Sequence, residues 1–204
     1  MNKSQTAPSA NPATNSITTT SFDSPGDNKS QHATFGGGCF WCLDAIFREI
    51  QGIETINSGF SGGIEPDPSY ELACSGQTGH AEVIHIKFDP TLLSYQSILS
   101  IFFAAHDPTQ LNRQGHDVGP QYRSVIFFHN QQQQQTAHQL ITAIDEQALW
   151  TDKIVTELTP FDAFYTAPEQ HQNFYQKRTT VPYCQIIIHP KLVKIRQLFG
   201  QLLI

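Results

Sequence analysis

The stretch FGGGCFWC, residues 35–42, decides how the fold of this 204-residue chain begins. Residues 32–35 are a short strand candidate that runs directly into the three glycines. Glycine allows a sharp turn at no steric cost, and apolar residues then recur at helical spacing from Phe40 to Ile50. The pattern predicts a strand, a tight turn and a helix that starts near Cys39.

Cys39 therefore stands at a predicted helix N-terminus. The first N–H groups of a helix have no intrahelical partner and carry partial positive charge, which favours a thiolate. We predict a depressed pKa for Cys39 and a nucleophilic role. Cys39 and Cys42 also fit a Cys-x-x-Cys redox pair. A phosphate loop or a zinc site fits less well, because the following Gly-Lys-Ser/Thr and a second close Cys/His pair are missing.

Alternation and helical periodicity predict the elements farther along the chain. In order, they are strands at 53–61 and 81–88, a helix at 94–105, a strand at 124–128, a helix at 131–147, strands at 154–158 and 185–188, and a helix from Pro190. Residues 65–79 and 107–121 are expected to be loops, and loops of this length are usually functional. The order predicts an α+β fold, a two-layer sandwich with helices packed on one face of a mixed sheet.

Composition argues against several classes of protein. The net charge is −6 and no long Lys/Arg run occurs, so nucleic-acid binding is not expected. No apolar run approaches the length of a membrane span, so no membrane association is expected. Four cysteines are too few for a disulfide scaffold, and reduced thiols in a cytoplasmic protein are expected. We expect neither a metal nor a cofactor.

The first 33 residues are rich in Ser, Thr, Asn, Pro and Gln. Such a segment cannot bury enough apolar area to offset its ordering entropy. We predict a disordered tail at residues 1–33 and a single catalytic domain at residues 34–204.

Several side chains near the predicted loops could join Cys39. If Glu82 is buried near aromatic rings, its pKa rises and it becomes a possible general acid; the alternative is a solvated carboxylate at a strand end. Phe40 or Trp41 is expected to wall a small apolar pocket beside the thiol. Cys74 is interpreted as a small buried hydrophobe, and Cys184 is expected in an exposed turn before a strand.

Four segments in register resemble the peptide methionine sulfoxide reductase A family. They are GCFW at 38–41, CSGQTGHAE at 74–82, the stretch from DPT to QYRS at 107–124, and EQHQ with Tyr175 at 169–175. The resemblance extends from residue 34 to about residue 200. It implies a ferredoxin-like plait core and reduction of the S epimer of methionine sulfoxide, both free and in oxidised proteins.

The resemblance also implies roles for individual residues. Cys39 would be the nucleophile, and Glu82 would protonate the sulfoxide oxygen. Tyr70 and Tyr122 would donate hydrogen bonds to that oxygen, Phe40 and Trp41 would hold the S-methyl group, and Asp117 would bind the substrate backbone or order the site.

A second thiol would then condense with the sulfenic acid left on Cys39, and thioredoxin would reduce the resulting disulfide. Cys184 matches the family's usual resolving position. Many members have Gly where Cys42 stands, so Cys42 is the alternative; we prefer Cys184 because cysteines three apart at a helix start often form a strained disulfide. No further recycling Cys follows Cys184, Pro120 stands where Thr is common, and a monomer is expected.

Two other functions compete with this interpretation. A general thiol–disulfide oxidoreductase built on Cys39 and Cys42 would reduce insulin and would not depend on Glu82. A binding module for oxidised methionine would show affinity for the sulfoxide without turnover.

Overall fold

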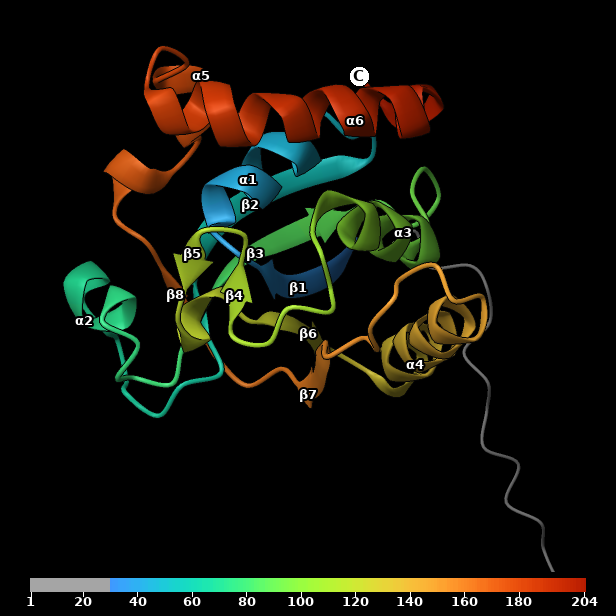
Figure 1. Cartoon of the computed structure of the whole chain (residues 1–204), viewed down its shortest axis with the longest axis horizontal. Coiled ribbons are helices and arrows are strands. Elements are labelled where there is room, and N and C mark those ends of the chain that lie inside the picture. Colours follow the sequence, from blue (N-terminus) through green and yellow to red (C-terminus); the bar gives the residue numbers. More distant parts are fainter. Residues whose placement is uncertain (1–29) are drawn as a thin grey trace, which may run out of the picture.

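The computed structural model describes residues 30–204, which form a curled six-stranded mixed sheet with helices packed on it (Figure 1). The strand order is β7-β6-β1-β3-β2-β8, with β6 and β7 parallel and the other neighbours antiparallel. This confirms the α+β class. The strands are β1 (Gln31–Gly37), β2 (Ile53–Ser61), β3 (Ala81–Phe88), β6 (Ser124–Phe128), β7 (Glu157–Pro160) and β8 (Phe164–Thr166).

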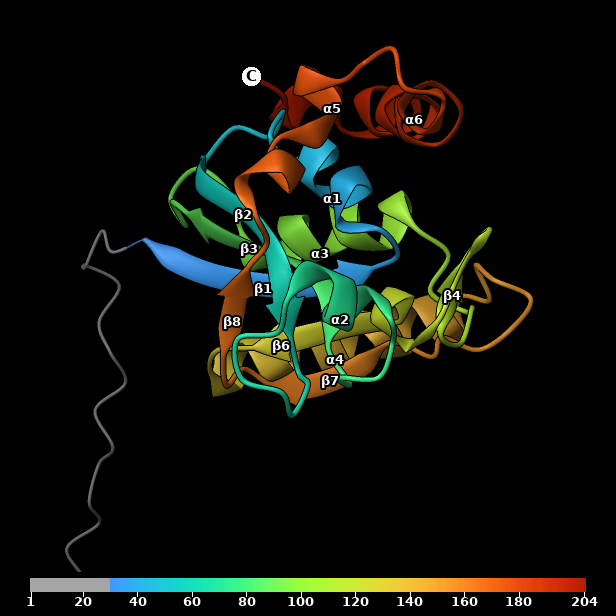
Figure 2. The same cartoon turned by 90° about the vertical axis from the view of Figure 1, so that its left-hand side faces the viewer.

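Helices pack against the strands of this sheet. Figures 1 and 2 show α1 between the sheet and α6, so the helices are stacked two deep at this point. The helices are α1 (Phe40–Phe47), α2 (Tyr70–Cys74), α3 (Tyr95–Ala105), α4 (Gln131–Glu146), α5 (Phe174–Lys177) and α6 (His189–Phe199). A separate hairpin pairs β4 (Arg113–Gln114) with β5 (Asp117–Val118).

The alternation in β3 explains which face of the sheet is buried under the helices. Residues of even number, from Glu82 through Ile84 and Ile86, point toward α1 and α3, because successive side chains of a strand face opposite sides. On β1, the Phe35 ring lies 5.1 Å from Phe47 and 5.0 Å from Phe102. Each such fully buried ring stabilises the fold by roughly 2–3 kcal/mol.

The glycine turn before α1 is sterically required. A Cβ on Gly36 would lie 2.6 Å from the carbonyl oxygen of Glu82, so only glycine lets β1 lie this close to β3. Gly38 has φ +90°, which L-residues rarely adopt. The turn therefore brings the start of α1 next to the first residues of β3.

Some elements differ from the sequence predictions. The expected loop at 65–79 contains α2, and the expected strand at 154–158 is shifted to β7. Residues 184–188, predicted as a strand, form a π-helical turn that continues into α6. Their apolar side chains contact the helical layer rather than a sheet edge.

Residues 1–29 of the tail predicted at 1–33 lie outside the described residues, whereas residues 31–33 of that tail belong to β1. The first strand begins at Gln31, three residues before the predicted start of the domain. Within residues 30–204, no helix combines the length and apolar character needed to cross a membrane.

Candidate active site

Cys39 and Glu82 meet where β1 leads into α1. Cys39 is the residue directly before α1, and the first N–H of the helix, on Phe40, donates to Oε2 of Glu82 at 3.0 Å. Both side chains are buried. The antiparallel pairing of β1 with β3 causes this meeting, because it carries the glycine turn to the start of β3. The two residues therefore belong to one site, as the sequence analysis expected.

Glu82 is a buried carboxyl without a cation beside it. Its side chain is 2% exposed, and burial raises its pKa to about 7, against the opposing effects of the hydrogen bonds from Phe40 and Cys74. The predicted rise in the pKa of Glu82 is confirmed, and the alternative of a solvated strand-end carboxylate is wrong. A carboxyl with this pKa can hold and release a proton near neutrality.

The pKa of the Cys39 thiol differs from the predicted one. Burial raises the pKa of this thiol well above its usual value, and the negative charge of Glu82 raises it further. Hydrogen bonds from the Trp41 backbone and from Tyr183 lower the pKa, but by less. The predicted depressed pKa is wrong because desolvation outweighs the helix N-terminus here. The resting form of Cys39 is a neutral thiol.

Cys74 is part of this site, although its sequence suggested a buried hydrophobe. It is half-buried at the end of α2, and its thiol donates to Oε1 of Glu82 at 3.7 Å. Gln121 holds the Cys74 carbonyl oxygen at 2.9 Å. The two carboxyl oxygens of Glu82 therefore have separate donors, an amide and a thiol.

Tyr70 and Tyr122 lie near this pair from two different elements. Burial raises the pKa of both phenols, and the charge of Glu82 raises it further. Both hydroxyls are consequently neutral near pH 7 and keep a proton that they can donate. The structure thus brings both sequence-predicted tyrosines to the surroundings of Cys39 and Glu82.

Aromatic rings stack beside the thiol. The Trp41 ring lies 3.7 Å from Phe174 with an interplanar angle of 6°, and His171 stacks on Tyr70 at 3.8 Å. Trp41 and His171 are also stacked, at 5.8 Å. Phe40 is fully buried in the core, whereas Trp41 is half-buried. Residues 171–174 had no assigned role in the sequence analysis, since nothing local predicts this stacking.

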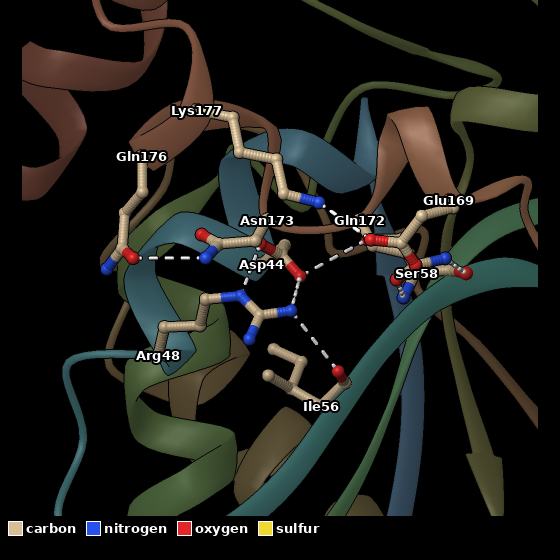
Figure 3. A network of polar contacts seen from close by, with 9 residues as sticks. All are labelled: Asp44, Arg48, Ile56, Ser58, Glu169, Gln172, Asn173, Gln176 and Lys177. Carbon is tan, nitrogen blue, oxygen red and sulfur yellow. Dashed lines mark hydrogen bonds and ion pairs between the residues drawn. The ribbon is translucent and has the colours of Figure 1, made fainter.

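A buried polar network holds residues 169–177 against α1 (Figure 3). Asp44 accepts two hydrogen bonds from Arg48, at 2.8 and 2.9 Å, and the Ser58 hydroxyl donates to Asp44 at 3.4 Å. Gln172 is bonded to both the N–H and the C=O of Ser58, each at 2.8 Å. Because His171 and Phe174 flank these anchored residues, the network fixes the rings that stack on Trp41 and Tyr70.

Tyr183 connects α1 to the β4–β5 hairpin, and the sequence analysis gave it no role. Its hydroxyl donates to Oδ2 of Asp117 at 2.7 Å and lies 3.9 Å from the sulfur of Cys42. Its hydrogen bond also lowers the pKa of Cys39. Asp117, predicted to bind substrate or to order the site, therefore lies one hydrogen bond away from the Cys39–Cys42 pair.

Cys184 occupies a different environment from the predicted one. It is fully buried at the start of the helical turn before α6, rather than in an exposed turn before a strand. All four cysteines are free thiols. In residues 30–204, no group of three or more His, Cys, Asp or Glu side chains could hold a metal ion.

Comparisons with known proteins identify the family of this chain. A family model described as peptide methionine sulfoxide reductase matches residues 31–202. The peptide methionine sulfoxide reductase MsrA of Saccharolobus solfataricus is 48% identical over 167 residues, which cover 82% of this chain and 93% of that protein.

Solved structures show the same fold. Reduced Mxr1 from Saccharomyces cerevisiae has a TM-score of 0.72 and 30% identity, covering 77% of this chain and 90% of Mxr1. Mxr1 in complex with Trx2 has a TM-score of 0.52 and 22% identity, covering 75% of this chain and 90% of that one. The chain belongs to the peptide methionine sulfoxide reductase family and is an oxidoreductase.

Proposed function

We propose that this enzyme reduces the S epimer of methionine sulfoxide with Cys39 as the nucleophile and Glu82 as the acid. One observation carries the assignment: a buried carboxyl with a pKa of about 7 accepts a hydrogen bond from the residue next to the buried thiol. A sulfoxide sulfur becomes electrophilic when its oxygen is protonated. A thiolate and a protonated carboxyl must therefore act together.

The raised pKa values of Cys39 and Glu82 mean that the pair shares one proton near neutrality. In the resting form this proton is on the sulfur, because Cys39 binds it more tightly than Glu82 does. Transfer to Glu82 produces the thiolate and the acid in one step and removes the charge that raises the pKa of Cys39. The thiolate attacks the sulfoxide sulfur while Glu82 protonates the oxygen. The hydroxyl then passes from the methionine sulfur to the Cys39 sulfur as the bond between the two sulfurs breaks, so methionine leaves and Cys39 becomes a sulfenic acid.

The neighbouring side chains fit the roles that the resemblance implies. Tyr70 and Tyr122 are neutral donors whose hydroxyls would bind the sulfoxide oxygen. Half-buried Trp41 would contact the S-methyl group, whereas Phe40 is fully buried and would support the Trp41 ring from the core, as the stack on Phe174 does. Asp117 would order the site through its hydrogen bond from Tyr183.

The sulfenic acid is then resolved by a second thiol, for which Cys184 and Cys42 are the two candidates. An external dithiol of the thioredoxin type would reduce the resulting disulfide and restore Cys39. The yeast relative Mxr1, solved in complex with Trx2, supports this choice of reductant. Both oxidised proteins and free methionine sulfoxide are proposed substrates.

A single-turnover assay tests this function. Reduced enzyme mixed with the S epimer, without reductant, should release one equivalent of methionine, and Cys39→Ser should release none. Cys74→Ser, which changes the other thiol next to Glu82 in the same way, is the matched control and should still release methionine. Full activity in Cys39→Ser would refute the assignment of the nucleophile, whereas insulin reduction independent of Glu82 would favour a general thiol–disulfide exchanger.

We also infer a ferredoxin-like plait for the core. The order β6-β1-β3-β2 with antiparallel neighbours, and the helices α1 and α3 between those strands in sequence, support this inference. A tail that ends before Gln31, where β1 begins, a monomeric state and a cytoplasmic location stay predictions, the last supported by the four free thiols.

A further inference from the structure

We infer that Cys42 is the thiol that attacks the sulfenic acid on Cys39, and that Tyr183 and Asp117 carry away its proton. This inference rests on the proposed function, since it concerns the second step of the same reaction. It assigns a role to Tyr183, and it reverses the preference for Cys184 over Cys42 that was drawn from the sequence.

The hydrogen bonds around Tyr183 run in one direction. A tyrosine hydroxyl has one proton to donate, and Tyr183 donates it to Oδ2 of Asp117 at 2.7 Å. While it donates to Asp117, its oxygen can accept from the Cys42 thiol, 3.9 Å away, and once Cys42 is ionised the same hydroxyl can donate to the sulfur, which lowers the pKa of Cys42. The order is therefore thiol to hydroxyl to carboxylate, which is the order that a proton leaving Cys42 requires.

Cys42 needs such a path because it is nearly inaccessible to water. Its side chain is 2% exposed, and burial raises its pKa. Lys191 on α6 and the Tyr183 hydroxyl lower that pKa, and Asp117 raises it. Tyr183 and Asp117 are both half-buried, so a proton received by Asp117 can pass on to solvent. Only the thiolate attacks a sulfenic acid.

The position of Cys42 also favours it over Cys184. Its backbone N–H donates to the carbonyl oxygen of Cys39 at 3.1 Å, so the two cysteines occupy the same helical turn. Their electrostatic interaction contributes to the raised pKa of Cys39. Cys184 is fully buried, and within residues 30–204 its sulfur makes no hydrogen bond. Burial alone raises its pKa, so nothing in its surroundings assists ionisation.

The step balances in atoms and electrons. The proton of Cys42 moves to the Tyr183 oxygen while the Tyr183 proton moves to Asp117, which leaves a thiolate hydrogen-bonded to Tyr183. The thiolate sulfur attacks the Cys39 sulfur, and the S–O bond breaks as hydroxide leaves and takes up the equivalent of the proton that passed from Cys42 through Tyr183 to Asp117. Cys42 is oxidised, the sulfenic sulfur is reduced, and the products are a Cys39–Cys42 disulfide and one water.

Time-resolved disulfide mapping tests the inference. Reduced full-length enzyme is mixed with methionine sulfoxide without reductant, quenched with an alkylating agent, and digested. The Cys39–Cys42 disulfide should form first in the wild type and should still form in Cys184→Ser. Cys42→Ser should release one equivalent of methionine and accumulate a sulfenic acid that dimedone traps. A Cys39–Cys184 bond as the first disulfide would overturn the inference, although methionine release would leave the proposed function intact.

Tyr183→Phe tests the proton path separately, because it removes one oxygen and keeps the ring beside Trp41. Disulfide formation should slow by about 10- to 100-fold, in the range of general acid–base contributions. The rate should recover as pH rises, because Cys42 then ionises without the relay. A merely structural role would not give this recovery. Disulfide formation at the wild-type rate, or a slow rate that does not change with pH, would exclude the path.

Discussion

Two buried carboxylates, Asp44 within α1 and Glu82 at the N-terminus of that helix, lie in very different environments. Burial raises the pKa of both. Asp44 is paired with Arg48 through two hydrogen bonds, and the Ser58 hydroxyl and the Asn173 backbone stabilise its charge further. Glu82 has an amide and a thiol as donors, and no Lys or Arg forms an ion pair with it within residues 30–204.

We attribute this difference to separate roles, a structural one for Asp44 and a catalytic one for the proposed acid Glu82. A paired buried charge is costly to disturb and does not easily exchange protons. An unpaired buried carboxyl instead keeps its proton to higher pH, which destabilises the charged form but makes it an acid near neutrality. We therefore expect Asp44 to support the fold around the site and Glu82 to act in the reaction.

The largest expected effect is on turnover. Glu82→Gln removes the acid and keeps the shape, so kcat should fall by about 10²- to 10⁴-fold, the usual contribution of a general acid. Asp44→Asn should keep most of its activity per folded molecule. Steady-state kinetics with methionine sulfoxide and dithiothreitol measure both variants, and an equal loss in the two would remove the distinction between them.

The next effect concerns stability. Asp44→Asn leaves the Arg48 guanidinium without its partner at a mostly buried site, and the free energy of unfolding should fall by about 3 kcal/mol. Urea denaturation at pH 7 measures this loss. Arg48→Met is the matched control, because it removes the other charge of the pair and should also destabilise the fold. A change below about 0.5 kcal/mol in Asp44→Asn would show that the pair is not structural.

Glu82→Gln should have the opposite effect on stability, with a definite pH dependence. The pKa of Glu82 is about 7 in the folded protein, against 4.5 when exposed. The folded state therefore holds an extra proton between these values, and wild-type stability falls as pH rises through this window. Well above pH 7 the Gln variant should be more stable by about 3 kcal/mol. Near pH 4.5 the two proteins should be equal, and a difference that is constant with pH would contradict a raised pKa.

The smallest effect distinguishes the two donors to Glu82. The Cys74 thiol lowers the pKa of Glu82 by hydrogen bonding to its carboxylate. The Cys39–Glu82 pair is active when it holds one proton in total, so kcat/KM rises as the pair loses its second proton, near pH 7. In Cys74→Ala this rise should move to higher pH. Cys74→Ser keeps a hydrogen-bond donor to Glu82, so its pH profile should return toward that of the wild type. Identical pH profiles in all three proteins would mean that the thiol does not affect Glu82.

Much of the fold followed from local pattern, and the exceptions have physical reasons. The alternation in residues 81–88 predicted β3, and its even-numbered face includes Glu82, so burial of this carboxyl was readable from the strand. The run QIII at 185–188 indicated a strand through its β-branched residues. The buried residues Cys184, Ile188, Leu192 and Ile195 have helical spacing across Pro190, a signal that points to the helix instead, because Pro is tolerated in a first turn.

The site was predictable in its residue types but not in its electrostatic balance. The position of Cys39 at a helix N-terminus was correct, yet the helix effect alone gave the wrong direction for its pKa. The degree to which the surroundings of Cys39 are buried depends on rings from β2, α2 and residues 171–174. These rings meet only in the folded chain. For the same reason, the contacts of Cys74 and Tyr183 had no local signature.

The most direct test of the account is the pKa of Glu82 in the reduced enzyme. The side-chain carboxyl carbons of ¹³C-labelled glutamate can be followed by NMR as pH is varied, and the Glu82→Gln spectrum assigns the resonance. The account predicts a titration at about pH 7, well above the exposed glutamates. A titration near pH 4.5 would mean that Glu82 is ionised at neutrality without sharing the proton of Cys39, and the proposed acid would be lost.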